Sequence, residues 1–181
     1  MRKNFKNLQI TCDGGAATGK STGAKMISRK YKLPMMSSGL LYRYASYLIL
    51  KFKPKNKILF FKKKFKKLNY KSLNSLNLHT PEISSHSASI AKILSVRNIL
   101  KQFQLNFIKN TKSCVLEGRD ASTKILPNSD VKFFFICSLN IASRRRLKEL
   151  KKKQKKITFK EVKKALHDRN MLDINRKISP L

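Results

Sequence analysis

Residues 14–22 read GGAATGKST and match the pattern G-x-x-x-x-G-K-[ST] of a phosphate-binding loop. The apolar run at 8–12 predicts a buried strand before the motif, and residues 24–29 predict a helix after it, which is the setting the motif requires. In such loops backbone N–H groups close around a phosphate, and the helix N-terminus adds partial positive charge. The stretch therefore predicts a nucleoside-triphosphate site with Lys20 on the outer phosphates and Ser21 on Mg²⁺. The residues of this expected ATP site are Gly14, Gly15, Ala16, Ala17, Thr18, Gly19, Lys20, Ser21 and Thr22.

The net charge of the chain is strongly positive. Its 181 residues include 42 Lys and Arg against 9 Asp and Glu, a formal net charge of +33. A charge of this size is typical of proteins that bind nucleic acid or anionic membranes. The excess is mostly lysine, is spread along the chain and travels with abundant Asn, Ile and Phe, as an A/T-rich coding sequence would produce. We therefore do not expect a nucleic-acid partner.

Length and cysteine content indicate one domain, residues 1–181, large enough to bury a core. The three cysteines have no metal-ligand spacing and lie in or beside apolar runs, as buried thiols in a reducing compartment do. The basic N-terminus is not followed by an apolar segment of the secretory type, and no run is long enough to span a bilayer. We expect a soluble cytoplasmic monomer.

The segment after the first helix predicts a strand at 33–36 and a helix from about Leu40. Arg43 falls near the start of that helix, where it can reach an anion at the mouth of the sheet; a solvated surface arginine is the alternative. From 51 to 80 the chain turns basic, with an irregular stretch centred on lysines at 62–67 and on Phe60, Phe61 and Phe65. Such interleaving suits a single-strand nucleic-acid platform. We favour a small, poorly packed lobe with a solvated charged face.

Residues 82–107 predict one long helix with an apolar stripe through Ile93, Val96 and Leu100, and Arg97 half-buried beside it. Residues 113–116 predict a strand, and 131–136 another that is covered on both faces of the sheet. Ligands in open α/β sheets bind at the carboxyl ends of strands, so Arg119 and Asp120 fall where a substrate would lie.

The last predicted helix begins at a capping box formed by Thr158 and Glu161. Arg169, Asp173 and Arg176 have the spacing i, i+4, i+7 and so share one face of this helix. A surface ladder of ion pairs and a binding site both fit this spacing.

Taken together, these pieces resemble the cytidylate kinase family, bacterial-type enzymes that transfer a phosphoryl group from ATP to CMP or dCMP. The resemblance rests on the phosphate loop, on Ser-Gly-Leu-Leu-Tyr-Arg at 38–43, on Glu-Gly-Arg-Asp at 117–120, and on the spaced Arg, Asp and Arg near the C-terminus. It implies a doubly wound parallel-sheet P-loop kinase fold with a small inserted monophosphate-binding lobe at 51–80 and a lid at 144–157.

The resemblance also implies a role for each site residue, with ATP and Mg²⁺ as cofactors. Arg43 and Arg119 would hold the CMP phosphate, and Arg169 and Arg176 would lie near the phosphates in flight. Together with Lys20 these four arginines form the expected catalytic set. The expected contacts to the nucleoside are Asp173 on the ribose and Arg97 with Asp120 on the cytosine edge, where a carboxylate accepts from the exocyclic amine.

Several positions depart from the family pattern. Gly15 stands where the family usually has Pro, Ser37 where it has Asp, Ser122 where it has Gly, and Ala88 where it has the Ser that contacts cytosine. The sequence ends at Leu181, so a final strand and helix of the family are expected to be missing. The alternatives are a kinase for another nucleoside monophosphate and a basic nucleic-acid-binding protein on an inactive P-loop scaffold.

Overall fold

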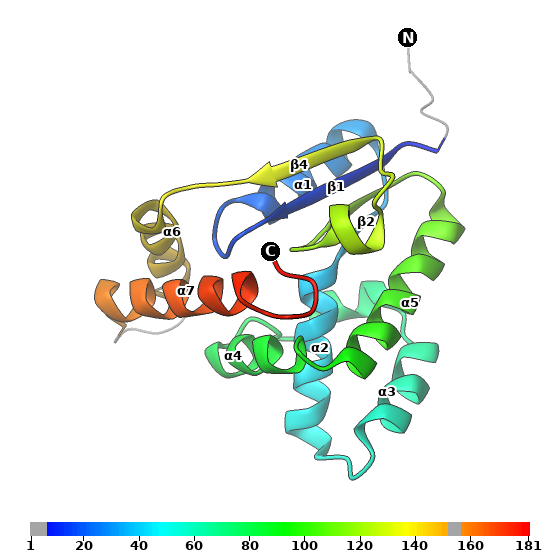
Figure 1. The fold of residues 1–181 in the computed structure, drawn as a ribbon, viewed down its shortest axis with the longest axis horizontal. Coiled ribbons are helices and arrows are strands. Elements are labelled where there is room, and N and C mark those ends of the chain that lie inside the picture. Colours follow the sequence, from blue (N-terminus) through cyan, green and yellow to red (C-terminus); the bar gives the residue numbers. More distant parts are fainter. Residues whose placement is uncertain (1–6, 152–156) are drawn as a thin grey trace.

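The computed structural model describes residues 7–151 and 157–181 and has a sheet of four parallel strands at its centre (Figure 1). The strands are β1 (Gln9–Gly14), β2 (Met35–Ser37), β3 (Cys114–Glu117) and β4 (Val131–Phe135), in the spatial order β2-β3-β1-β4. The register sets Ile10 opposite Val115 on one side and Val131 on the other. Strands that follow one another in the sequence are parallel and are not all neighbours in the sheet, so the chain crosses over the sheet through helices.

Helices cover both faces of the sheet, which confirms the doubly wound α/β fold. Helix α1 (Lys20–Tyr31) packs on the face that carries Ile10, Cys12 and Val115. The opposite face carries Met36 and Leu116 and packs against α2 (Ser38–Phe52) and α5 (Leu94–Thr111). All four residues of β3 are buried, as expected for a strand without polar alternation between two helical layers.

The inserted segment 51–80 is packed, not irregular. It forms α3 (Lys57–Lys66) and a short 3₁₀ helix (Tyr70–Ser75), and Phe61 and Phe65 are buried in the main core beside α2 and α5. The expectation of a poorly packed lobe is therefore wrong, because the phenylalanines at i and i+4 share one helix face that packs on the rest of the domain. The solvated charged face is confirmed, since Lys62, Lys63, Lys66 and Lys67 are all exposed. A nucleic-acid platform that uses Phe61 and Phe65 is also wrong, because both rings are buried in the core and cannot stack on bases.

The single long helix expected at 82–107 is wrong. The chain forms α4 (Pro81–Ile90) and α5, separated by a break at Ala91, Lys92 and Ile93. Ile93 has an extended backbone and is exposed, so it does not belong to the buried stripe. The carbonyl of Ala91, freed by the break, accepts a hydrogen bond from Arg97 Nη1 at 3.2 Å. No Gly or Pro marks this break, so apolar periodicity runs across it.

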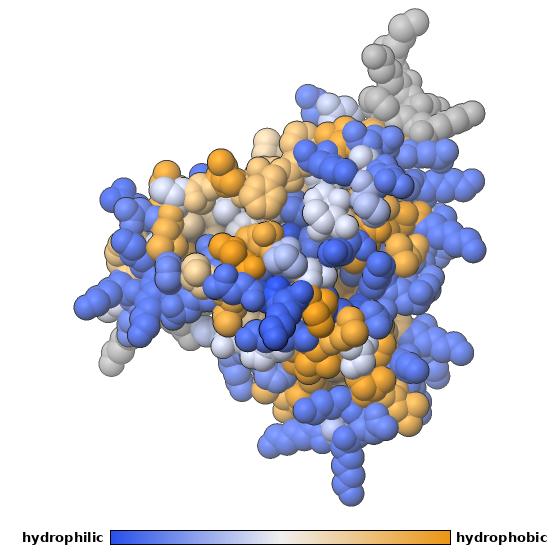
Figure 2. Space-filling model, viewed as in Figure 1, coloured by the Kyte–Doolittle hydropathy of each residue, from blue (hydrophilic) through white to orange (hydrophobic). Residues whose placement is uncertain are grey.

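Strand β4 lies at an edge of the sheet and is not covered on both faces, contrary to expectation. Val131, Phe133 and Phe134 are exposed, and Figure 2 shows apolar side chains on this part of the surface. Only Phe135 packs inward, against the α1 face. No further strand pairs with β4 within residues 7–151 and 157–181.

The chain ends with two helices that pack on each other beside the strand ends. Helix α6 (Leu139–Lys151) and helix α7 (Phe159–Ile174) bury Ala142, Leu150, Val162 and Leu166 between them. Thr158 and Glu161 form the capping box predicted for α7. The expected lid at 144–157 includes the second half of α6, and its residues 152–156 lie outside the described part of the chain.

The packing of α3 generates a stability prediction. Phe61 has 0 % exposure, so Phe61→Ala should lower the free energy of unfolding by about 3–5 kcal/mol through lost burial and the cavity it leaves. Leu59 lies on the same helix with 65 % exposure, and Leu59→Ala should change it by about 0.5 kcal/mol or less. Urea unfolding of both variants checks this. Equal, small losses would show that α3 does not dock on the core.

Candidate nucleotide and phosphate site

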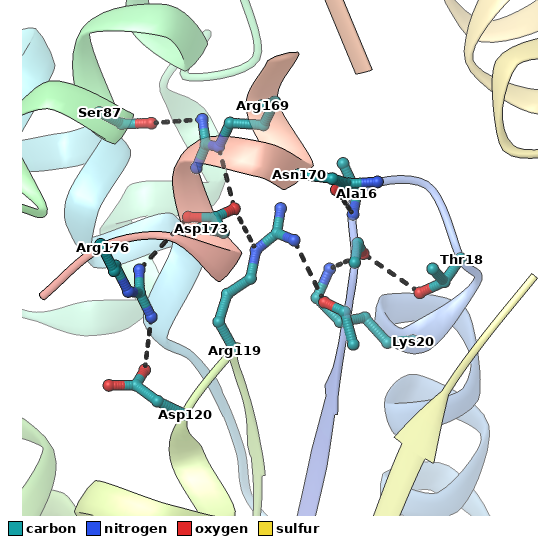
Figure 3. A network of polar contacts seen from close by, with 12 residues as sticks. Ala16, Thr18, Lys20, Ser87, Arg119, Asp120, Arg169, Asn170, Asp173 and Arg176 are labelled. Carbon is teal, nitrogen blue, oxygen red and sulfur yellow. Dashed lines mark hydrogen bonds and ion pairs between the residues drawn. The ribbon is translucent and has the colours of Figure 1, made fainter. Parts of the chain in front are cut away.

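The predicted site residues gather where β1, β2 and β3 end. The phosphate loop follows β1, α2 begins directly after β2, and the turn at 118–120 follows β3. The carboxyl ends of parallel strands lie at one edge of a sheet, so three separate sequence motifs meet there. The C-terminal part of the chain brings two arginines to the same edge, Arg169 on α7 and Arg176 just after that helix (Figure 3).

The phosphate loop has the backbone geometry of an anion cradle. Gly14 has φ +145°, and a Cβ there would lie 2.3 Å from the carbonyl oxygen of Phe135, so no other residue fits. Gly19, with φ +95°, ends the loop as the N-cap of α1 without a side-chain cap. Among the described residues, the N–H groups of Gly19, Lys20 and Ser21 have no hydrogen-bond partner. They are free donors at a helix N-terminus, with Ser21 and Thr22 exposed beside them.

Lys20 is held close to this loop. Its Nζ donates to the Gly15 carbonyl at 3.1 Å and lies 3.5 Å from Glu117 Oε1, and the side chain is only 11 % exposed. Burial lowers the pKa of Lys20 to about 8, helped by the charges of Arg119 and Arg43 and opposed by Glu117. The ammonium group is thus poised to gain stability from an added anion.

Two buried carboxylates that the sequence analysis did not assign organise the strand ends. Asp13 accepts hydrogen bonds from the N–H groups of Ala121 at 2.9 Å and Ser122 at 2.7 Å, so it fixes the turn that carries Arg119 and Asp120. Glu117 accepts a short hydrogen bond from Ser37 Oγ and pairs with Lys20. Asp13 is the last residue but one of β1 and Glu117 the last residue of β3, and this position at the end of a buried strand was the signal available in the sequence.

Asp173 is shared by three arginines. Its Oδ2 lies 3.2 Å from Arg119 Nε and 3.3 Å from Arg169 Nε, and its Oδ1 lies 3.3 Å from Arg176 Nη1 (Figure 3). The carboxylate is buried, so these pairs are shielded from water. Helix α7 ends at Ile174, so Arg176 lies just beyond it, and the expectation that it shares a helix face with Arg169 and Asp173 is wrong. The three side chains nevertheless form an ion-pair centre inside the site and not a surface ladder. Both carboxylate oxygens of Asp173, which was expected to bind the ribose hydroxyls, are thus paired with guanidinium groups.

Asp120 and Arg97 meet as a buried pair. Arg97 Nη2 donates a short hydrogen bond to Asp120 Oδ2, and Arg176 Nη2 lies 3.7 Å from Asp120 Oδ1. Arg97 is buried and not half-buried as expected, and its guanidinium also lies 5.7 Å from the centre of the Tyr42 ring. The break between α4 and α5 directs Arg97 inward. Asp120 pairs with neither Arg119 nor a helix N-terminus.

Arg43 is a half-buried cation whose guanidinium is incompletely paired. Its Nε is buried and has no hydrogen-bond partner among the described residues. Burial lowers its pKa to about 10, with the positive charges of Arg169, Arg146 and Arg119 acting in the same direction and Glu117 against it. Such a group is stabilised by any anion that enters between these arginines.

Helices α6 and α7 also touch the phosphate loop. Asn170 Oδ1 accepts from the Ala16 N–H at 3.0 Å, and Arg145 Nη1 donates to the Thr18 carbonyl at 3.2 Å. Arg169, next to Asn170, reaches the other way and donates to the Ser84 carbonyl of α4 at 2.5 Å. Asn170 was not among the predicted site residues, and its neighbour Arg169 was the signal available in the sequence.

The assembled site carries an excess of positive charge. Six cationic side chains gather around three carboxylates: Lys20, Arg43, Arg97, Arg119, Arg169 and Arg176 around Glu117, Asp120 and Asp173. Within the described ranges, no cluster of three His, Cys, Asp or Glu side chains forms a metal-binding group. This arrangement of cations around carboxylates suits phosphate-bearing ligands.

In the described part of the chain, no helix combines the length and apolar character needed to cross a bilayer.

Comparison with known proteins gives one consistent result. A family model described as cytidylate kinase matches residues 10–181. A cytidylate kinase of Bartonella tribocorum is 34% identical over 182 residues, which cover 98% of this chain and 83% of that protein. Cytidylate kinases of Fusobacterium nucleatum and Clostridium botulinum are each 33% identical, over 97% of this chain and 85% of those proteins.

The pKa of Lys20 generates a prediction for triphosphate binding. In the free protein Lys20 is half deprotonated near pH 8, and a bound triphosphate favours its charged form, so binding raises this pKa. Binding of Mg·ATP should take up about 0.7 of a proton at pH 8.5 and about 0.1 at pH 7. Calorimetry in buffers of different ionisation enthalpy measures this uptake.

Lys20→Met is the control for that measurement, because it retains the length of the side chain without a titrating group. The difference in uptake between pH 7 and pH 8.5 should disappear in this variant. Equal uptake by the parent and Lys20→Met at pH 8.5 would contradict the assignment of Lys20 to the phosphates.

Proposed function

The chain belongs to the cytidylate kinase family, and from that premise and the geometry of the site we propose that it transfers the γ-phosphoryl group of ATP to CMP and dCMP, giving ADP with CDP or dCDP. The bond between the γ-phosphorus and its bridging oxygen to the β-phosphate breaks, and a bond to an oxygen of the monophosphate forms. This reaction places the protein in pyrimidine nucleotide metabolism.

One observation supports this proposal above the others: the cation-rich site has buried donors without acceptors. Arg43 Nε and Arg176 Nη2 are buried without a hydrogen-bond partner in the described chain, and the loop N–H groups at the start of α1 are equally free. Unpaired buried donors cost free energy that a ligand phosphate recovers. Because donors lie both at the loop and between the arginines, their arrangement suits two phosphate groups side by side.

Each cation then has a part in positioning and neutralising phosphate. We assign Arg43 and Arg119 to the CMP phosphate, and Arg169 and Arg176 to the phosphoryl group in transfer. Lys20 would act on the charge that develops between the donor and acceptor phosphates. Phosphoryl transfer needs alignment and charge neutralisation more than a covalent intermediate, which agrees with a site rich in arginine.

The residues also fit Mg²⁺ bound through the nucleotide. Mg²⁺ typically keeps several waters and takes one or two protein ligands together with substrate phosphates, so it needs no cage of carboxylates. The hydroxyl of Ser21, exposed in the first turn of α1, would be its protein ligand. When bound, Mg²⁺ would neutralise charge on the donor phosphates.

Base and sugar recognition is assigned to the two carboxylates that the arginines hold. Asp120, oriented by Arg97, would accept from the exocyclic amine of cytosine. Asp173 would meet the ribose hydroxyls, and for this the sugar has to share its oxygens with the three guanidinium groups now on them.

We further propose that the protein works as a monomer in the cytoplasm. Its cysteines are free, and burial raises the pKa of the Cys12 thiol to about 12 and that of Cys114 to about 11. Thiols held protonated in this way suit a reducing compartment. The exposed lysines of α3 need no nucleic-acid partner, since Phe61 and Phe65, two of the three phenylalanines that would stack bases, are in the core.

The reaction is tested by a coupled assay of ADP release with ATP, Mg²⁺ and each monophosphate in turn. CMP and dCMP should be the best acceptors. A clear preference for UMP, AMP or GMP would favour the alternative kinase, and no turnover with any monophosphate would contradict the proposed reaction.

Base choice gives a sharper prediction. Asp120 faces the amine of cytosine as an acceptor, whereas uracil presents a carbonyl at that edge, so two acceptors would meet unpaired. Such a mismatch costs about 1–3 kcal/mol, roughly ten- to hundredfold in kcat/KM. Asp120→Asn should therefore lower kcat/KM for CMP much more than for UMP.

Asp130→Asn is the matched control, because Asp130 is exposed and accepts from the Gln9 N–H at the opposite end of the sheet. It should leave the CMP/UMP ratio of kcat/KM unchanged. A ratio that stays the same in the Asp120 variant as well would remove Asp120 from base recognition.

A further inference from the structure

One residue of the inserted segment reaches the phosphate site. Tyr70 begins the 3₁₀ helix that follows α3, and its Oη accepts a hydrogen bond from the N–H of Ser37 at 2.7 Å. Ser37 is the last residue of β2 and the N-cap of α2, the helix that carries Arg43. The contact therefore joins the inserted segment to the strand end at which phosphates are expected.

Ser37 extends this contact to the lysine of the phosphate loop. Its Oγ donates to Glu117 Oε2 and accepts from the Leu40 N–H at 3.3 Å. Glu117 Oε1 in turn lies 3.5 Å from Lys20 Nζ. An unbroken path of polar contacts thus runs from Tyr70 through Ser37 and Glu117 to Lys20.

Tyr70 can hold its place because the segment around it is anchored. Leu73, one turn further along the 3₁₀ helix, and Leu78 beyond it are buried in the main core together with Phe65 of α3. Tyr70 itself packs on that core. Burial raises its pKa to about 12, so the phenol stays neutral, and its oxygen remains an acceptor in a fixed position.

Burial also makes each contact in the path sensitive to its neighbours. Glu117 is 3 % exposed, so water cannot replace a lost partner easily. If Ser37 moves, its hydroxyl leaves Glu117, and the carboxylate is then free to shift away from Lys20. Phosphoryl transfer depends on such positioning, because a misplaced charge loses most of its effect on the transition state.

We propose that Tyr70 is a positioning residue for phosphoryl transfer, which fixes the ammonium group of Lys20 through Ser37 and Glu117 without touching either nucleotide. This inference rests on the proposed function only where the test measures turnover of CMP. It makes the inserted segment part of the phosphate site, so that docking of α3 and the 3₁₀ helix is needed for full activity.

Tyr70→Phe tests the proposal, because it removes only the Oη. It should lower kcat for CMP about tenfold while changing the KM for CMP by about threefold or less, since one buried hydrogen bond is lost and no substrate contact is. Tyr47→Phe is the matched control: Tyr47 lies on α2, and its Oη accepts from exposed Lys51. It should leave kcat unchanged, and the melting temperatures of both variants should match the parent within a few degrees.

A double-mutant cycle with Glu117→Gln separates positioning from general loosening. If Tyr70 acts through Glu117, Tyr70→Phe should cost about tenfold in the parent and twofold or less when Glu117 is already Gln. Equal losses in both backgrounds would overturn the proposal. So would a Tyr70→Phe variant with parental kcat, or one whose KM for CMP rises while kcat holds.

The same double-mutant cycle can be measured without turnover, by calorimetry of Mg·ATP binding in the absence of CMP. Tyr70→Phe should weaken binding about threefold or more in the parent and not further in Glu117→Gln. A parent that binds ATP and shows this coupling but phosphorylates no monophosphate would contradict the proposed function and support the role of Tyr70. Unchanged affinity in Tyr70→Phe would overturn that role, whatever the activity.

Discussion

The carboxylate of Asp173 sits between three guanidinium groups, and the rest of the site depends on that sharing. A single buried anion brings Arg119 from the turn after β3 together with Arg169 of α7 and with Arg176, which follows the end of that helix. It does not neutralise them, because Arg43 and Lys20 add further positive charge at the same edge of the sheet. The free protein therefore holds its cations close at an electrostatic cost, and a phosphate offsets that cost when it binds.

Local structure serves this arrangement in several places. The break between α4 and α5 turns Arg97 toward Asp120, and Asp13 fixes the turn that holds Asp120 through two backbone hydrogen bonds. Asn170 ties α7 to the phosphate loop, so the helix that carries Arg169 and Asp173 and the loop that would bind a triphosphate are held together. Four of the nine acidic residues are buried in or beside the site, which leaves the surface lysines largely uncompensated.

The sequence predicted the phosphate loop, the doubly wound sheet and the membership of the site, because each motif follows a short buried strand and needs only local pattern to be found. It did not predict the break at Ala91, since an apolar period of Ile90, Ile93 and Val96 fits one helix equally well. It predicted that both faces of β4 are covered, because a run of phenylalanines is equally compatible with an edge strand and a central strand. The path from Tyr70 to Lys20 was also out of reach, because it is formed by residues far apart in the chain whose meeting depends on how the inserted segment packs.

The central claim is that a phosphate group, and not the nucleoside, completes the half-buried cluster of arginines. It is tested most directly by the melting temperature of the protein with increasing CMP or cytidine at constant ionic strength and without ATP. CMP should raise the melting temperature in a concentration-dependent way, because its phosphate offsets the cost of the excess positive charge, while cytidine at the same concentrations should raise it little or not at all. Equal stabilisation by cytidine would contradict the account.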